Sequence, residues 1–200
     1  DAALQTQLHK EMATTLSGAG LSRAAAIIQN PNTGEILAMA SFPTFDNNLF
    51  TSGLSEQSFK QLFENKTRPL FNRVIGGLYN PGSTIKPLIA LMALEEGVVT
   101  PQDTIQDCIN LIIPNPTTGE PAYIFKNWRA DTGSFNLRRA IADSCNVYFF
   151  TVGGGFGKIS GLGISKIAYY LGETFANSLL GLDISGEEEG LVPDPVWKES

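Results

Sequence analysis

The sequence predicts a mixed α/β fold with one domain-sized core. Two patterns support this prediction: a strand, a turn and a strand follow one another near the N-terminus, and several later segments repeat apolar residues at helical spacing. The chain has 200 residues, of which 42% are apolar and 10% aromatic, and this is enough to bury a substantial core. The disordered and fibrous classes are therefore excluded.

Charge and cysteine content exclude further classes. The net charge is −6 and the 14 Lys and Arg residues are scattered, so we expect no nucleic-acid partner. Cys108, Cys145 and the single histidine, His9, do not form a zinc-ligand pattern, so we expect no metal and no cofactor. The sequence leaves open whether the two cysteines are free or bonded. No apolar run is long enough to span a bilayer.

The first third of the chain predicts a helix, a β-hairpin and a second helix. Residues 1–16 carry Leu or Met at every fourth position, which indicates an amphipathic helix. Residues 24–29 and 35–41 are strand-like runs on either side of the turn-forming sequence Asn-Pro-Asn-Thr-Gly, and they predict the hairpin. Ser55 precedes apolar residues at helical spacing, so it predicts a capped helix over 55–65.

The rest of the chain predicts short helices separated by turns. Apolar periodicity indicates helices over residues 88–97, 137–142, 147–152 and 164–171. Residues 100–127 are rich in proline and turn-forming residues, so we expect irregular structure there, with a small hairpin around 117–120. The triplet Asp131-Thr132-Gly133 is interpreted as a turn.

The turn at Pro81-Gly82 runs directly into a helical pattern and places Ser83 and Lys86 at its start. Residues three apart on a helix share a face, so these two side chains can meet. A serine becomes a nucleophile when a base takes its proton, and burial near the positive end of a helix lowers a lysine pKa toward the range of a base. Alone, Ser-x-x-Lys is a weak signal, because a capping serine beside a solvated lysine has the same pattern.

A second pattern, Ser-x-Asn, occurs twice. The first copy, Ser134-Phe135-Asn136, immediately precedes a predicted helix, so helix capping explains it. The second copy, Ser144-Cys145-Asn146, lies between two apolar segments, where a cap is not obviously needed. A hydroxyl and a carboxamide there can pass protons and hold a substrate amide. Cys145 is interpreted as a small apolar filler, because no histidine lies nearby in the sequence to activate it.

Together these segments resemble the penicillin-recognising serine acyltransferases, whose motifs are Ser-x-x-Lys, Ser-x-Asn and Lys-Thr-Gly. The resemblance is to class B penicillin-binding proteins of the elongation-specific, penicillin-binding protein 2 type. It runs in the family's order over residues 28–41, 72–73 with 79–87, 133–150 and 181–197. It implies the transpeptidase and β-lactamase-like fold, an antiparallel sheet flanked by helices.

The resemblance also implies roles for four residues. Ser83 is the expected nucleophile and Lys86 its base, Ser144 relays a proton to the leaving amine, and Asn146 binds substrate. The implied activity is that of a peptidoglycan D,D-transpeptidase. Ser83 attacks a D-Ala-D-Ala stem peptide, D-Ala leaves, and an amine of a second stem peptide resolves the acyl-enzyme. β-Lactams would acylate the same serine.

One departure from the family concerns the third motif, because no Lys-Thr-Gly follows Ser144. We therefore expect residues 1–200 to be a C-terminally incomplete transpeptidase domain. The missing part would supply that motif and the last three strands of a five-stranded sheet, and without it one edge of hairpin 24–41 should be unpaired. The family further implies a periplasmic position, an N-terminal membrane helix not in this chain, and a membrane glycosyltransferase partner.

Two rival functions remain open. A serine β-lactamase shares the first two motifs, but it needs a group that activates water for deacylation, and none is identifiable in the sequence. A non-catalytic penicillin-sensing module or pseudoenzyme would keep the fold without the third motif.

Overall fold

The computed structural model describes residues 1–51, 53–174 and 177–199. The chain divides into two compact units. The first comprises Asp1–Leu78 and Gly181–Glu188, and the second comprises Tyr79–Leu180 and Glu189–Ser200. Each unit combines helices with a two-stranded antiparallel sheet, so the predicted mixed α/β class is confirmed.

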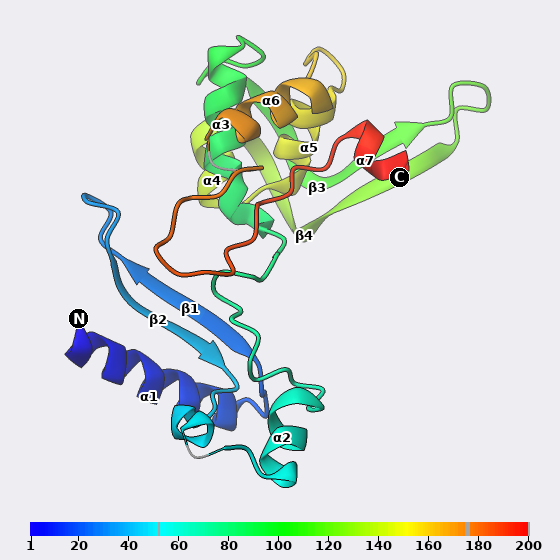
Figure 1. Ribbon diagram of the computed structural model, residues 1–200. Coiled ribbons are helices and arrows are strands. Elements are labelled where there is room, and N and C mark those ends of the chain that lie inside the picture. Colours follow the sequence, from blue (N-terminus) through cyan, green and yellow to red (C-terminus); the bar gives the residue numbers. More distant parts are fainter. Residues whose placement is uncertain (52, 175–176, 200) are drawn as a thin grey trace. The chain divides into compact units, whose positions relative to one another are not determined.

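The first unit contains the predicted helix and hairpin (Figure 1). Strands β1 (Ala24–Gln29) and β2 (Ile36–Phe42) pair antiparallel, and helix α1 (Ala2–Gly18) packs on β2. The contact is apolar, and its buried members are Leu16, Ala40 and Phe42. After a 3-10 helix, η1 (Asn47–Phe50), comes helix α2 (Glu56–Phe63), which is capped by Ser55 as predicted.

The side chain of Gln5 in α1 makes hydrogen bonds to main-chain groups of β2, as a neighbouring strand would. Its Nε2 donates to the carbonyl of Met39 at 2.7 Å, and its Oε1 accepts from the N–H of Met39 at 2.9 Å. The main-chain nitrogen of Asp1 donates to the carbonyl of Leu37 at 2.8 Å. These bonds satisfy main-chain groups on the outer edge of β2, while β1 pairs with β2 alone among the described strands.

The second unit surrounds its core with helices and a long hairpin. Its elements in chain order are the 3-10 helix η2 (Gly82–Ile85), α3 (Lys86–Glu95), β3 (Thr104–Pro114), β4 (Pro121–Asn136), α4 (Leu137–Ala142), α5 (Asn146–Gly154), α6 (Ile164–Thr174) and α7 (Pro195–Glu199). Helices α3 to α6 lie where the sequence predicts helices. The largest fully buried side chains come from the hairpin and α5, and they include Phe135, Tyr148 and Val152. No helix in the described part of the chain is long and apolar enough to cross a membrane.

Two sequence interpretations in this unit are wrong. Residues 100–127 are not irregular, because most of them belong to β3 and β4, which pair antiparallel from Thr104 and Asn136 to Pro114 and Pro121 with register shifts between. The triplet Asp131-Thr132-Gly133 lies within β4 and not in a turn. Two of the prolines that suggested irregular structure, Pro114 and Pro121, lie at strand ends, where a proline without an N–H is tolerated.

Candidate active site

Ser83 lies in η2, immediately before α3. The turn that begins this junction depends on Gly82, whose φ of 58° is a left-handed value that glycine adopts without a Cβ clash. In a 3-10 helix, residues three apart are eclipsed, so Ser83 and Lys86 face the same side. Ser83 is exposed, and its hydroxyl is therefore accessible to a ligand from solution.

Lys86, the first residue of α3, is buried, with 8% of its surface exposed. Its Nζ donates to the Ser144 carbonyl at 2.8 Å, to Ser144 Oγ at 3.0 Å and to Asn146 Oδ1 at 2.6 Å. These three bonds use all the N–H groups of an ammonium. Burial lowers the pKa of Lys86 below its ordinary value, because loss of water disfavours the charged form. The ring of Phe149, 5.4 Å from Nζ, favours the cation and acts in the opposite direction.

Ser144 occupies a position that usually belongs to glycine. Helix α4 ends in a Schellman motif, in which Ser144 N–H donates to the Ile141 carbonyl at 3.1 Å and Cys145 N–H donates to the Ala140 carbonyl at 2.9 Å. The residue after the helix cap in this motif takes left-handed backbone angles, and Ser144 has φ 52°. A side chain with a Cβ costs roughly 1–2 kcal/mol there. Strain of this kind is typical of functional sites, and both the carbonyl and the hydroxyl of Ser144 bind Lys86.

Ser144 also connects Lys86 to Ser83. Its Oγ accepts from Lys86 Nζ and donates to Ser83 Oγ, with a distance of 3.0 Å in each bond. Lys86 N–H donates to the Ser83 carbonyl in the main chain, but in the described structure no hydrogen bond joins Lys86 Nζ to Ser83 Oγ. The sequence led us to expect a direct meeting of the first-motif pair, whereas the structure places the second-motif hydroxyl between them.

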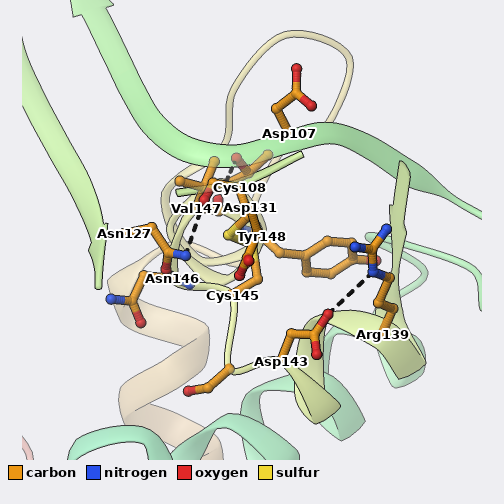
Figure 2. The surroundings of a disulfide bond; sticks show 12 residues. Asp107, Cys108, Asn127, Asp131, Arg139, Asp143, Cys145, Asn146, Val147 and Tyr148 are labelled. Carbon is orange, nitrogen blue, oxygen red and sulfur yellow. Dashed lines mark hydrogen bonds and ion pairs between the residues drawn. A yellow bond between two sulfur atoms is a disulfide. The ribbon is translucent and has the colours of Figure 1, made fainter. Parts of the chain in front are cut away.

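Asn146, the fourth predicted site residue, begins α5 and joins the same cluster through its contact with Lys86. Its main-chain N–H donates to Oδ1 of Asn127 in β4 at 2.9 Å. Figure 2 shows Asn127 beside Asn146 and Cys108, with its Nδ2 donating to the Cys108 carbonyl at 3.0 Å. All four predicted residues are therefore brought together at the junction of α3, α4 and α5.

A disulfide joins Cys108 of β3 to Cys145, inside the second motif (Figure 2). The interpretation of Cys145 as a simple apolar filler is therefore wrong, although the residue is fully buried. Its sulfur also accepts from the N–H of Tyr148 at 3.3 Å and so caps α5. The second motif thus includes a helix cap after all, and cysteine provides it.

Sequence reasoning missed Asn127 and the disulfide. Asn127 lies in the segment interpreted as irregular, so its neighbours could not be inferred. An even number of cysteines in a chain assigned to an oxidising compartment is the signal that predicts pairing. Within the described ranges, no group of three or more His, Cys, Asp and Glu side chains could hold a metal ion.

Comparison with known proteins gives a family match over most of the chain. Residues 24–200 match the transpeptidase family described as penicillin binding protein transpeptidase domain. The peptidoglycan D,D-transpeptidase MrdA of Acinetobacter baumannii is 34% identical over 177 residues, which are 88% of this chain and 25% of the relative. MrdA of Escherichia coli K12 is 32% identical over 197 residues, which are 98% of this chain and 29% of the relative.

Solved structures show the same relationship. PBP2 of Pseudomonas aeruginosa in complex with WCK 5153 superposes with a TM-score of 0.73 at 37% identity, over 90% of this chain and 39% of that one. PBP2 of Helicobacter pylori in complex with MreC gives a TM-score of 0.79 at 29% identity, over 96% and 33%. These matches confirm the predicted fold and the resemblance to penicillin-binding protein 2. The chain spans less than a third of the length of the curated relatives compared above.

Proposed function

This chain belongs to the penicillin-binding protein transpeptidase family, and on that premise we propose that it carries the nucleophile of a peptidoglycan D,D-transpeptidase. Its substrates are stem peptides ending in D-Ala-D-Ala, and β-lactams acylate the same residue. The observation that carries the proposal is the chain of bonds from Lys86 Nζ through Ser144 Oγ to Ser83 Oγ, each 3.0 Å long. These two hydrogen bonds connect the exposed hydroxyl of Ser83 to the buried amine of Lys86 through the hydroxyl of Ser144.

Acylation begins when Ser83 Oγ attacks the substrate carbonyl and its proton leaves. The proton passes to Ser144 as that residue gives its own proton to Lys86, so only positions of protons change between the three groups. Lys86 must be neutral to accept, and burial favours the neutral form. The same hydroxyl then returns a proton to the departing D-Ala amine, which is the relay role assigned to Ser144.

Asn146 orients the reacting groups. Its Oδ1 holds Lys86, while the Nδ2 group of the same carboxamide is a donor suited to a substrate carbonyl. In the described part of the chain, the residues that precede η2 and α3 make no side-chain cap bond, which leaves main-chain N–H groups near Ser83 without a capping side chain. Those donors favour the negative oxygen that develops during acyl transfer.

In this proposal, the third motif, the last strands of the sheet and the membrane helix lie outside residues 1–200. Residues 1–200 form a C-terminally incomplete transpeptidase domain, and a further segment supplies Lys-Thr-Gly and the last strands of the sheet. The protein acts at the periplasmic face of the cell membrane, held by an N-terminal helix outside this sequence, beside a membrane glycosyltransferase. Support for an assembly comes from a relative, since H. pylori PBP2 has been solved in a complex with MreC.

The decisive experiment locates the acylated residue. The intact protein that carries this sequence is treated with a fluorescent penicillin, digested and analysed by mass spectrometry. We expect the adduct on the peptide containing Ser83, and none in Ser83→Ala. Ser134→Ala is the matched control, because it removes a serine hydroxyl from the first Ser-x-Asn copy and should acylate like the wild type.

Other outcomes separate the rival functions. An adduct that forms and is released rapidly as hydrolysed penicillin would assign the chain to the β-lactamases. Reversible binding without an adduct would favour a penicillin-sensing module. Labelling of Ser83→Ala at the wild-type rate would remove Ser83 from the proposed role.

A further inference from the structure

We propose that Asn127 is a positioning residue for acylation, and that it shares this role with the Cys108–Cys145 disulfide. Both attach residues 144–146 to the β3–β4 hairpin and so hold Ser144 and Asn146 against Lys86. The inference rests on the proposed function, because it concerns how the same site is kept in working geometry.

Both polar atoms of the Asn127 carboxamide have hydrogen-bond partners. Its Oδ1 accepts from the N–H of Asn146 at 2.9 Å, and its Nδ2 donates to the carbonyls of Cys108 at 3.0 Å and Arg129 at 2.8 Å. All three partners are main-chain groups, in β3, in β4 and at the start of α5. A side chain bonded in this way sets where three stretches of backbone lie relative to one another.

The bond to Asn146 lies at the N-terminus of α5, where main-chain N–H groups have no partner within the helix. Asn146 is the first residue of α5. Cys145 Sγ accepts from Tyr148, and Asn127 accepts from Asn146, so two of these donors are satisfied. The direction in which α5 starts decides where the Asn146 side chain lies, and its Oδ1 is 2.6 Å from Lys86 Nζ.

The disulfide is a second link between the same two places. The disulfide joins Cys108 to Cys145 (Figure 2). Asn127 joins the carbonyl of Cys108 to the N–H of Asn146, the residue that follows Cys145. The covalent bond passes through side chains, and the hydrogen bonds pass through main-chain groups. Because the two links restrain one short segment, either one compensates in part for the loss of the other.

The test compares two asparagines of the same hairpin in the intact protein. Asn127→Ala removes the three bonds described above. Asn115→Ala removes two bonds from the turn between β3 and β4, where Oδ1 accepts from Thr117 at 2.8 Å and Thr118 at 3.3 Å. Progress curves with a fluorescent penicillin separate the acylation rate constant from the dissociation constant of the initial complex.

We expect Asn127→Ala to lower the acylation rate constant by about tenfold to a hundredfold, the effect of displacing a catalytic group by a fraction of an ångström to one ångström. The dissociation constant should change by less than about threefold, and Asn115→Ala should match the wild type in both. Equal effects of the two variants would overturn the proposal, because they would show general loosening of the hairpin.

Coupling between the two links is measured with a dithiol reductant. The dithiol gives up two electrons and two protons, becomes a disulfide itself, and converts Cys108 and Cys145 to thiols. Reduction of Asn127→Ala should slow acylation by more than the product of the two separate effects. The variant Cys108→Ser with Cys145→Ser is the control, since it should not respond to the dithiol. If the combined slowing of acylation equals the product of the two separate effects, or is smaller, the shared role is overturned.

Amide hydrogen exchange distinguishes failure of this inference from failure of the proposed function. Residues 144–147 should exchange faster in Asn127→Ala than in the wild type, and Asn115→Ala should leave them unchanged. A wild type that forms no acyl-enzyme would defeat the proposed function, and the exchange rates would still decide whether Asn127 holds the segment. Unchanged exchange in Asn127→Ala would defeat this inference even in an active enzyme.

Discussion

The two Ser-x-Asn copies lie at opposite ends of α4 and have different surroundings. In the first copy, Asn136 caps the helix, and its Oδ1 accepts from the N–H of Arg139 at 3.0 Å. In the second copy, Ser144 follows the end of the helix with left-handed backbone, and Asn146 Oδ1 accepts from Nζ of Lys86. The asparagine carboxamide thus caps a helix in the first copy and binds the buried amine of Lys86 in the second.

The comparison shows that the partner, and not the pattern, sets the role of these side chains. A carboxamide oxygen beside a free helix N–H stabilises local structure by about 1 kcal/mol. The same oxygen beside a buried amine controls a group able to move a proton. Substitutions in the two copies and at Lys86 therefore test the assignment of the site.

Removing Lys86 should have the largest effect, because this residue is what distinguishes the second copy from the first. We expect Lys86→Ala to slow acylation by a fluorescent penicillin by about a hundredfold or more, the usual contribution of a general base. Lys166→Ala is the control, since Lys166 forms a partly exposed ion pair with Glu96 away from this bond network. Acylation of Lys86→Ala within about twofold of the wild type would contradict the role of the amine.

Matched loss of the two asparagines should separate activity from stability. Asn146→Ala removes an acceptor of Lys86 and should slow acylation by about tenfold or more. Asn136→Ala should leave the acylation rate unchanged and lower the free energy of unfolding by about 1 kcal/mol, through loss of the α4 cap. Acylation kinetics and urea unfolding measure the two quantities. A similar loss of acylation in both variants would end the distinction between the copies.

Substitutions at Ser144 should reveal the backbone cost of placing a serine there. Ser144→Ala and Ser144→Gly both remove the hydroxyl, so both should slow acylation. Glycine tolerates φ 52° and alanine does not, so we expect Ser144→Gly to be more stable than Ser144→Ala by about 1 kcal/mol. Urea unfolding measures the difference. Equal stabilities would show that the left-handed backbone carries no cost.

The smallest expected effect concerns pH. Burial lowers the folded-state pKa of Lys86 below 10.5, so its ammonium destabilises the fold at low pH. This cost is complete below the folded-state pKa and disappears as the pH rises toward 10.5, where the unfolded chain also loses the proton. The wild type should therefore gain stability relative to Lys86→Met over that window. A stability difference that does not change with pH would contradict the lowered pKa.

The two hairpins explain how far sequence reasoning reached in the fold. In β1, every second residue is partly buried, and the connecting turn contains Gly34 at φ 80°, so local pattern and structure agree. In β3, burial recurs at residues 105, 108 and 111, a spacing that hides the alternation of a strand. The register shifts on both sides of Cys108 cause this, because an irregular ladder changes which face successive residues occupy.

The sequence by itself determined the mixed α/β class, most of the helices, the first hairpin and the candidate residues Ser83, Lys86, Ser144 and Asn146. These depend on periodicity, caps and motifs, which act between residues close in the chain. Only the tertiary structure decided that Ser144 lies between Lys86 and Ser83, contacts that join residues 58 and 61 positions apart. It also brought Asn127 and the Cys108–Cys145 disulfide to the second motif. The physical reason is that such contacts arise when packing brings distant segments together, and no local pattern records which distant groups will meet.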